Sequence, residues 1–218
     1  MDIAKYIDHT LLKPDATREQ IALICDEAKQ YSFASVCVNP VWVDFCSGLL
    51  KNTEVKVCAV VGFPFGASMG MAKAKEAMLA VEMGAQEIDM VVNIGGLKSN
   101  LADLVAEDIL VVRSATPGVI LKVIIETCLL TREEKILACK IAKRAGADFV
   151  KTSTGFSSGG ATVEDVTLMR KVVGKKIGVK AAGGIRDFAT AKAMLDAGAN
   201  RLGCSASVAI VKEALSKT

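Results

Sequence analysis

The chain has 218 residues, of which 51% are hydrophobic and 23% charged, and its formal net charge is +3. This length and apolar content predict one large domain spanning 1–218 rather than two small ones. Acidic and basic residues are mixed throughout, which argues against a nucleic-acid partner, and no apolar run approaches the roughly 18–20 residues of a membrane span.

Seven cysteines lie among apolar neighbours without CxxC spacing. This distribution favours reduced thiols in a soluble, cytoplasmic protein over a disulfide framework. His9 is the only histidine in the sequence, so a zinc site built from several imidazoles of one chain is excluded.

Strand-like and helical patterns alternate along the chain. A short amphipathic opening, predicted as an N-terminal helix, precedes a first strand at 8–10. Thr17-Arg18-Glu19-Gln20 has the form of a capping box and begins the first long helix. Further strands are expected at 35–38, 55–61, 87–92, 120–126, 149–153, 177–182 and 201–204.

Helices are expected between these strands, one of them at 72–83. A second capping box begins at Thr131, and Asp187 and either Ser205 or Ser207 are candidate caps for the last two helices. The apolar face of the helix after residue 100 is expected to contain Leu101, Leu104, Val105, Ile109 and Val112.

The strand starts recur on average about every 28 residues, the length of one β/α unit. Gly84, Gly146 and Gly198 each stand between a helix end and the next strand, where a glycine closes a helix. Eight apolar strands alternating with helices predict a single (β/α)8 TIM barrel of the α/β class. An open doubly wound sheet is the alternative, disfavoured because no GxGxxG follows the first strand.

Lys151 and Lys180 each lie in a strand-like run that breaks into glycine and small residues. Because alternate residues of a strand share a face, both lysines can point into the barrel mouth, where active sites of such barrels lie. Each side chain could simply extend along the wall to solvent. The functional alternative is that a neighbouring cation and partial desolvation lower the pKa of one of the two lysines, whose neutral amine then attacks a carbonyl to form a Schiff base.

Asp89 lies in the apolar strand at 87–92, where an unpaired carboxylate is costly to bury. One interpretation is a structural ion pair with a lysine. The other is that Asp89 moves protons during imine formation, with Lys180 holding it charged and relaying through water. The two interpretations are compatible, because one pair can serve both purposes.

The segments 181–186 and 203–207 follow the seventh and eighth predicted strands. In barrels these two loops commonly bind phosphate through backbone N–H groups and hydroxyls. Gly183-Gly184 is a weak signal alone, since tight turns also use it, but its place in the eight-unit count predicts a phosphorylated substrate.

Six motifs resemble those of the deoxyribose-phosphate aldolase family, in the same order and over most of the chain. They are IDHTLLKP at 7–14, VCVNP at 36–40, VGFPFG at 61–66, EIDMV at 87–91, FVKTSTG at 149–155 and VKAAGGIR at 179–186. The resemblance implies a class I aldolase that needs no metal or other cofactor. It implies reversible cleavage of 2-deoxy-D-ribose 5-phosphate to acetaldehyde and D-glyceraldehyde 3-phosphate, in deoxyribonucleotide catabolism, and a homodimer.

By the same resemblance, Lys151 is the Schiff-base lysine, and Asp89 and Lys180 donate and accept protons. The expected substrate-binding residues are Asp8 and Thr10, near the sugar hydroxyls, together with Thr154, Gly155, Gly183, Gly184 and Ser205. Two rival functions stay open, namely another phosphate-binding barrel enzyme and a catalytically silent barrel that binds a sugar phosphate.

Two departures from the family pattern are visible. Ala206 stands where some members have a second serine, with Ser207 one position further on, which puts one phosphate contact in question. Some members also end in a tyrosine that assists proton transfer, whereas the last tyrosine here is Tyr31. Proton relay is therefore expected to use Asp89, Lys180 and water.

Overall fold

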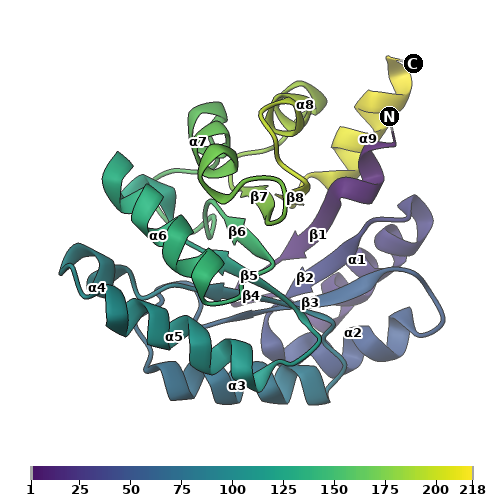
Figure 1. The fold of residues 1–218 in the computed structure, drawn as a ribbon. Helices are drawn as coiled ribbons and strands as arrows, with labels where there is room; N and C mark the ends of the chain where they lie inside the picture. The colour runs from purple at the N-terminus through teal and green to yellow at the C-terminus, as the bar shows by residue number, and fades with distance from the viewer. Residues whose placement is uncertain (1, 218) are drawn as a thin grey trace.

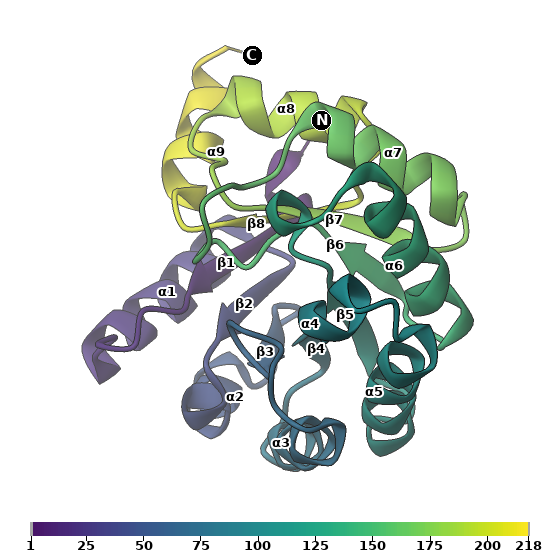
Figure 2. The same cartoon turned by 90° about the vertical axis from the view of Figure 1, so that its left-hand side faces the viewer.

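The computed structural model describes residues 2–217, which form a closed barrel of eight parallel strands surrounded by helices (Figure 1 and Figure 2). Each strand pairs with its neighbours in sequence, and β1 (Ile7–Leu11) closes the ring by pairing with β8 (Arg201–Cys204). The predicted (β/α)8 TIM barrel is therefore confirmed, and the open doubly wound sheet is excluded.

The strand starts agree with the sequence prediction to within one residue. The other strands are β2 (Ser35–Val38), β3 (Lys56–Val61), β4 (Glu87–Val91), β5 (Ile120–Ile124), β6 (Phe149–Lys151) and β7 (Gly178–Ala182). β5 and β6 each end two residues before the predicted end. For β5 the reason is local, because Glu126 adopts a left-handed backbone with φ +54° that no strand continues.

The helices lie outside the strand ring, as Figure 2 shows. They are α1 (Arg18–Tyr31), α2 (Val43–Leu50), α3 (Gly70–Glu82), α4 (Ile94–Lys98), α5 (Ala102–Ala115), α6 (Arg132–Arg144), α7 (Val163–Val173), α8 (Phe188–Asp196) and α9 (Ser207–Ser216). Short 3-10 turns are η1 (Ile3–Tyr6), η2 (Pro40–Trp42) and η3 (Thr127–Leu129), of which η1 is the predicted N-terminal helix. No helix within 2–217 is long and apolar enough to cross a membrane.

The predicted capping boxes at the starts of α1 and α6 are both present. The Thr17 hydroxyl accepts from the backbone N–H of Gln20, whose side chain accepts from the backbone N–H of Thr17. Thr131 and Glu134 form the same reciprocal pair. These contacts satisfy donors that a helix start otherwise leaves unpaired, so the local sequence determines where both helices begin.

Of the caps predicted for the last two helices, one is confirmed and the other is wrong. The Asp187 carboxylate accepts from the backbone N–H of Thr190 and caps α8 as expected. The prediction that Ser205 or Ser207 caps α9 is wrong, because the N-cap is Ala206 and no side chain caps this helix. Ser207 is instead buried, with its hydroxyl donating to the backbone oxygen of the last β8 residue at 3.0 Å.

The predicted apolar face of α5 is partly wrong. Val105, Ile109 and Val112 are fully buried as expected, whereas Leu101 and Leu104 are about half exposed. Leu101 is the N-cap of α5 rather than part of the helix. Of the five residues expected on one buried face, Leu101 therefore precedes the helix and Leu104 lies on its exposed side.

Three Gly-Ala pairs close the helices that precede β4, β6 and β8. Gly84, Gly146 and Gly198 have φ values of +107°, +83° and +109°. The residue after each glycine donates its backbone N–H to a carbonyl in the last turn, as Ala85 does to Ala80 at 2.9 Å. Glycine adopts this backbone without the steric cost other residues meet, which explains the repeat.

Most of the apolar core lies between the strand ring and the helices, where the outward faces of the strands meet the buried faces of the helices. The barrel interior has a separate small apolar cluster, formed by Leu12, Cys37, Cys58 and Val60 with Phe63 packed against it. Several other interior positions carry charged side chains, and these form the candidate site.

Candidate active site

Asp89, on β4, is the centre of a buried network of lysines. Its Oδ2 accepts from Nζ of Lys151 at 2.8 Å and from Nζ of Lys180 at 2.7 Å. Its Oδ1 accepts from Nζ of Lys122 at 2.8 Å and from Sγ of Cys58 at 3.2 Å. All five side chains are at most 2–3% exposed. The structure thus brings together the three residues predicted to be catalytic and adds a third lysine.

The strand register explains this meeting. Asp89 of β4 is the direct neighbour of Lys122 on β5, and Lys151 of β6 is the direct neighbour of Lys180 on β7. Inward and outward positions alternate along each strand, so these four side chains point into the barrel from adjacent strands. Four consecutive strands therefore place one carboxylate among three lysine side chains.

Asp8 extends the network on β1. Its Oδ2 lies 2.5 Å from Nζ of Lys180, and its Oδ1 accepts from the Ser35 hydroxyl at 2.7 Å and from Arg201 at 2.6 Å. Asp8 is fully buried and does not line the cavity described below. Its predicted contact with a sugar hydroxyl stays a prediction, since its present partners are Lys180, Arg201 and Ser35.

Lys122, Glu87 and Arg201 are members of the network that the sequence interpretation missed. Nζ of Lys122 lies 2.5 Å from a Glu87 oxygen, and Arg201 lies 3.2 Å from the other one. Lys122 had the same signal as Lys151, a lysine within an apolar strand run. Glu87 is two residues before Asp89, so strand alternation places both on one face.

The charges of the network determine its protonation. Burial alone would raise the pKa of Asp89, but Lys122, Lys151 and Lys180 together hold it well below its ordinary value. Burial alone would lower the pKa of Lys180, but Asp8 and Asp89 raise it above its ordinary value, and the pKa of Lys122 is raised for the same kind of reason. At neutral pH the Asp89 carboxylate is ionised, and Lys122 and Lys180 are ammonium groups.

A cavity of about 280 Å³ opens at the C-terminal ends of β1, β6, β7 and β8. Six of the predicted substrate-binding residues line it, namely Thr10, Thr154, Gly155, Gly183, Gly184 and Ser205. Lys151 also lines this cavity, whereas Lys122 and Lys180 do not. Of the three lysines bound to Asp89, only Lys151 is therefore in reach of a molecule in the cavity.

The part of the cavity beside the β7–α8 and β8–α9 loops suits an anion. Gly183 and Gly184 line this cavity with φ values of +88° and +79°, a backbone conformation that favours glycine. Lys13 and Arg186 line the same cavity, are exposed, and have no ion-pair partner within 2–217. Backbone donors and two unpaired cations form a suitable environment for a phosphate group.

Glu126 supports the loop after β6 from behind the cavity. Its carboxylate accepts from the backbone N–H of Thr154 at 3.3 Å and from the Thr154 hydroxyl at a shorter distance. The Thr154 hydroxyl in turn accepts from the backbone N–H of Phe156 at 3.0 Å. Thr154 is thus firmly held where it lines the cavity.

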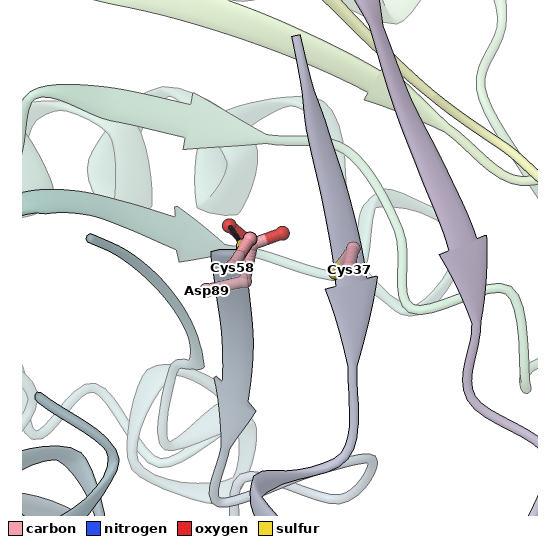
Figure 3. A group of neighbouring side chains, drawn as sticks. All are labelled: Cys37, Cys58 and Asp89. Carbon is pink, nitrogen blue, oxygen red and sulfur yellow. Dashed lines mark hydrogen bonds between the residues drawn. The ribbon is translucent and has the colours of Figure 1, made fainter. Parts of the chain in front are cut away.

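Potential metal ligands lie on another side of Asp89. The sulfur atoms of Cys37 and Cys58 and a carboxylate oxygen of Asp89 all lie within 4.8 Å of one another (Figure 3). No second group of three such ligands occurs within the described part of the chain.

Comparisons with known proteins agree on one family. The family model described as "DeoC/LacD family aldolase" matches residues 3–212. A deoxyribose-phosphate aldolase of Halalkalibacterium halodurans is 62% identical over 211 residues, covering 96% of this chain and 94% of the relative. One of Caldanaerobacter subterraneus is 61% identical over 216 residues, covering 98% and 94%. The crystal structure of a putative deoxyribose-phosphate aldolase from Coccidioides immitis superposes with a TM-score of 0.96 at 46% identity, covering 98% of this chain and 86% of the other.

Proposed function

Since this chain belongs to the DeoC/LacD family of aldolases and has deoxyribose-phosphate aldolase activity, we propose that Lys151 forms the covalent intermediate of that reaction. The reaction reversibly cleaves 2-deoxy-D-ribose 5-phosphate to acetaldehyde and D-glyceraldehyde 3-phosphate. The observation that carries the proposal is the position of Lys151, which alone among the three lysines bound to Asp89 lines the cavity.

The environment of Lys180 supports the same assignment. A nucleophilic amine must lose its proton before it attacks a carbonyl, and Asp8 and Asp89 hold Lys180 in its ammonium form by raising its pKa. Lys180 is also completely buried. An ammonium group beside Asp89 is suited to proton transfer, so the two lysines have different roles.

The chemical steps balance as follows. Neutral Lys151 attacks C1 of the open-chain sugar phosphate, and loss of water gives a protonated imine. The C3 hydroxyl loses its proton, the C2–C3 bond breaks, and its electron pair moves toward the imine nitrogen. D-Glyceraldehyde 3-phosphate leaves, and an enamine of the two-carbon fragment stays on Lys151. Protonation at C2 and hydrolysis then release acetaldehyde and free Lys151.

Asp89 and Lys180 are the proposed proton carriers in these steps. Nζ of Lys151 and Nζ of Lys180 both donate to Oδ2 of Asp89, so a proton has a path of two hydrogen bonds between the two nitrogens. The near-complete burial of this network strengthens each interaction, because the local dielectric constant is low. Water in the cavity completes the relay to the substrate.

The phosphate group is proposed to lie against Gly155, Gly183, Gly184 and Ser205, where Lys13 and Arg186 supply positive charge. Ser207 is buried behind this loop, with its hydroxyl donating to a backbone oxygen. We therefore assign it no direct phosphate contact.

Borohydride reduction tests the assignment of Lys151. Incubation with acetaldehyde and sodium borohydride should leave a reduced two-carbon adduct on Lys151, located by peptide mass spectrometry. The Lys151→Ala variant should form no adduct and cleave no deoxyribose 5-phosphate. Lys56→Ala, which changes the first residue of β3, is the matched control and should keep both adduct and activity.

An adduct that persists in Lys151→Ala would refute the assignment of the nucleophile while leaving the aldolase activity intact. A retro-aldol assay repeated after treatment with a chelator should give an unchanged rate. A rate lost on chelation and restored by a metal would contradict Schiff-base catalysis.

We also propose a cytoplasmic location, one domain over 1–218 and a homodimer. All seven cysteines are free, as expected in a reducing compartment. Pairing of β1 with β8 makes the barrel depend on both ends of the chain, so a single cooperative unfolding transition is expected.

Met71 and Leu110, 72% and 48% exposed, border an apolar groove between α3 and α5 that a second copy would cover. Light scattering that gives a monomer mass would refute the dimer.

A further inference from the structure

Cys37 and Cys58 form a pair of thiols beside the catalytic carboxylate. They are direct neighbours on the parallel strands β2 and β3, and both point into the barrel. Asp89 lies on the next strand, β4, and Figure 3 shows the three side chains with the hydrogen bond from Cys58 to Asp89 drawn. All three side chains are fully buried. The proposed aldol mechanism uses neither thiol.

We propose that Cys37, Cys58 and Asp89 form an inhibitory site for a thiophilic divalent cation such as Zn²⁺ or Cd²⁺. The two sulfur atoms and one carboxylate oxygen would be the protein ligands, and a fourth position would remain for water. This site goes beyond the aldolase reaction, whose proposed steps involve no metal ion.

The distances suit such a cation. Tetrahedral zinc has bonds of about 2.3 Å to sulfur and about 2.0–2.2 Å to oxygen, which places a sulfur and an oxygen ligand roughly 3.5 Å apart. Sγ of Cys58 already lies 3.2 Å from Oδ1 of Asp89, and all three ligand atoms lie within 4.8 Å of one another. Small side-chain rotations of Cys37 and Cys58 are therefore enough to close the site.

The charge balance also permits binding, although lysines surround Asp89. As each sulfur–metal bond forms, the thiol proton leaves to solvent, so a divalent cation enters as two protons depart. The net charge of the buried network is unchanged by this exchange. A harder cation such as Mg²⁺ would gain nothing from the sulfur atoms and is expected to be rejected.

Binding would disable the carboxylate through one of its two oxygens. Oδ1 of Asp89 faces Cys58 and Lys122, whereas Oδ2 faces Lys151 and Lys180. A cation on Oδ1 would displace Nζ of Lys122, which keeps its contact with Glu87 at 2.5 Å. Asp89 would then hold the cation instead of exchanging protons.

A cation that enters from the substrate cavity would meet the side chain of Leu12 before it reaches the thiols. Leu12 lines the substrate cavity and also belongs to the apolar cluster that contains both thiols. Because Leu12 must move before a hydrated cation reaches Cys37 and Cys58, inhibition is expected to develop slowly after mixing. Substrate in the cavity should slow it further.

A cadmium titration tests the site without reference to catalysis. Reduced protein, freed of thiol reagent and chelator, is titrated with CdCl₂ while the sulfur-to-cadmium charge-transfer absorption is followed in the ultraviolet. Cys37→Ser and Cys58→Ser keep a hydroxyl of similar size and remove one soft ligand each. Both should lose most of this absorption and bind cadmium at least about tenfold more weakly.

Two control variants separate this site from the other thiols. Cys128→Ser removes the exposed cysteine, and Cys46→Ser removes a buried one on α2, outside the barrel. Both should keep the saturable absorption and slow inhibition by Cd²⁺ or Zn²⁺, reversed by a chelator. Absorption and inhibition that persist in both Cys37→Ser and Cys58→Ser, or that vanish in a control variant, would overturn the proposal. So would binding without inhibition.

Discussion

Strands β4 to β8 place charged side chains inside the barrel, whereas β2 and β3 place thiols and an aliphatic side chain there. The charged side contains Glu87, Asp89, Lys122, Lys180 and Arg201, joined by ion pairs of 2.5–3.2 Å. The apolar side is formed mainly by Cys37, Cys58 and Val60, with Leu12 and Phe63 covering them. Asp89 lies where the two sides meet.

The difference shows how a buried network of charges is maintained. Buried charges are costly unless they are paired, and each charged side chain of this set has at least one ion-pair partner. The apolar side contributes no ion pair but keeps water from one flank of Asp89. Changes on the charged side should therefore affect both stability and catalysis, and changes on the apolar side mainly stability.

Asp89→Asn should have the largest effect. The change removes the charge that pairs with three buried lysines, which should lower the free energy of unfolding by about 3–5 kcal/mol and kcat by at least roughly 10³-fold. Urea unfolding and the retro-aldol assay measure the two. Asp196→Asn, at an exposed pair with Lys192, is the control and should change stability by less than about 1 kcal/mol. An equal effect of the two would mean that burial of the network is immaterial.

Lys122→Met should have the next largest effect. Its effect on the free energy of unfolding should depend on pH. The depressed pKa values of Asp8 and Asp89 contribute stability that is present above their unfolded pKa of about 4 and lost as pH falls through the folded pKa. Without Lys122 the folded pKa of Asp89 rises toward the unfolded value, so the loss on acidification should be smaller and should end at a higher pH.

The melting temperature measured from pH 7 down to pH 3 reports this change, and a cost of about 1–3 kcal/mol is expected at pH 7. Lys140→Met, on the exposed side of α6, is the control and should follow the parent curve. Parallel curves for Lys122→Met and the parent would show that Lys122 does not act on Asp89.

Arg186→Gln tests whether the Arg186 cation in the cavity binds the substrate phosphate. Loss of an unpaired cation should raise KM for deoxyribose 5-phosphate about tenfold, equivalent to about 1.4 kcal/mol, with kcat little changed. KM for unphosphorylated 2-deoxyribose should not move. Lys175→Gln, an exposed residue outside the cavity, is the control. An equal rise for both sugars would place Arg186 away from the phosphate.

Val60→Ala should have the smallest effect on activity. Val60 is 1% exposed inside the apolar cluster, and its truncation should cost about 1–2 kcal/mol of stability while kcat changes less than about twofold. Val41→Ala, at a side chain 76% exposed, should cost less than about 0.5 kcal/mol. A large loss of kcat in Val60→Ala would show that both sides of the interior are catalytic.

Features carried by neighbouring residues could be predicted well from the sequence. Thr17 and Thr131 begin helices because their capping partners lie three residues away. Where a prediction depended on a distant contact, it was incomplete or wrong. Ser207 resembled a helix cap, but its hydroxyl lies 2.8 Å from Nδ1 of His9 on β1, a partner 198 positions away.

The predictions for the candidate site were likewise right where they depended on neighbouring residues and incomplete where they depended on distant ones. Strand alternation in the sequence was enough to turn Lys151 and Lys180 inward, and their motifs predicted a Schiff-base aldolase. Physical arguments from the sequence did not decide which of the two lysines reaches the cavity. They also did not reveal Lys122, Glu87 and Arg201 as members of the network. Those relations join strands 30 to 190 positions apart and follow only from the closed register of the barrel.

The sequence by itself therefore determined the order of strands and helices, the capping boxes of α1 and α6 and the kinds of side chain that face inward, because each depends on residues close along the chain. Only the tertiary structure decided how those side chains pair. Closure of the barrel brings oxygens of Asp8 and Asp89 to 2.5 Å and 2.7 Å from Nζ of Lys180, and these contacts hold its ammonium form. Pairing of buried charges is a property of three-dimensional neighbours, which a strand pattern leaves undefined.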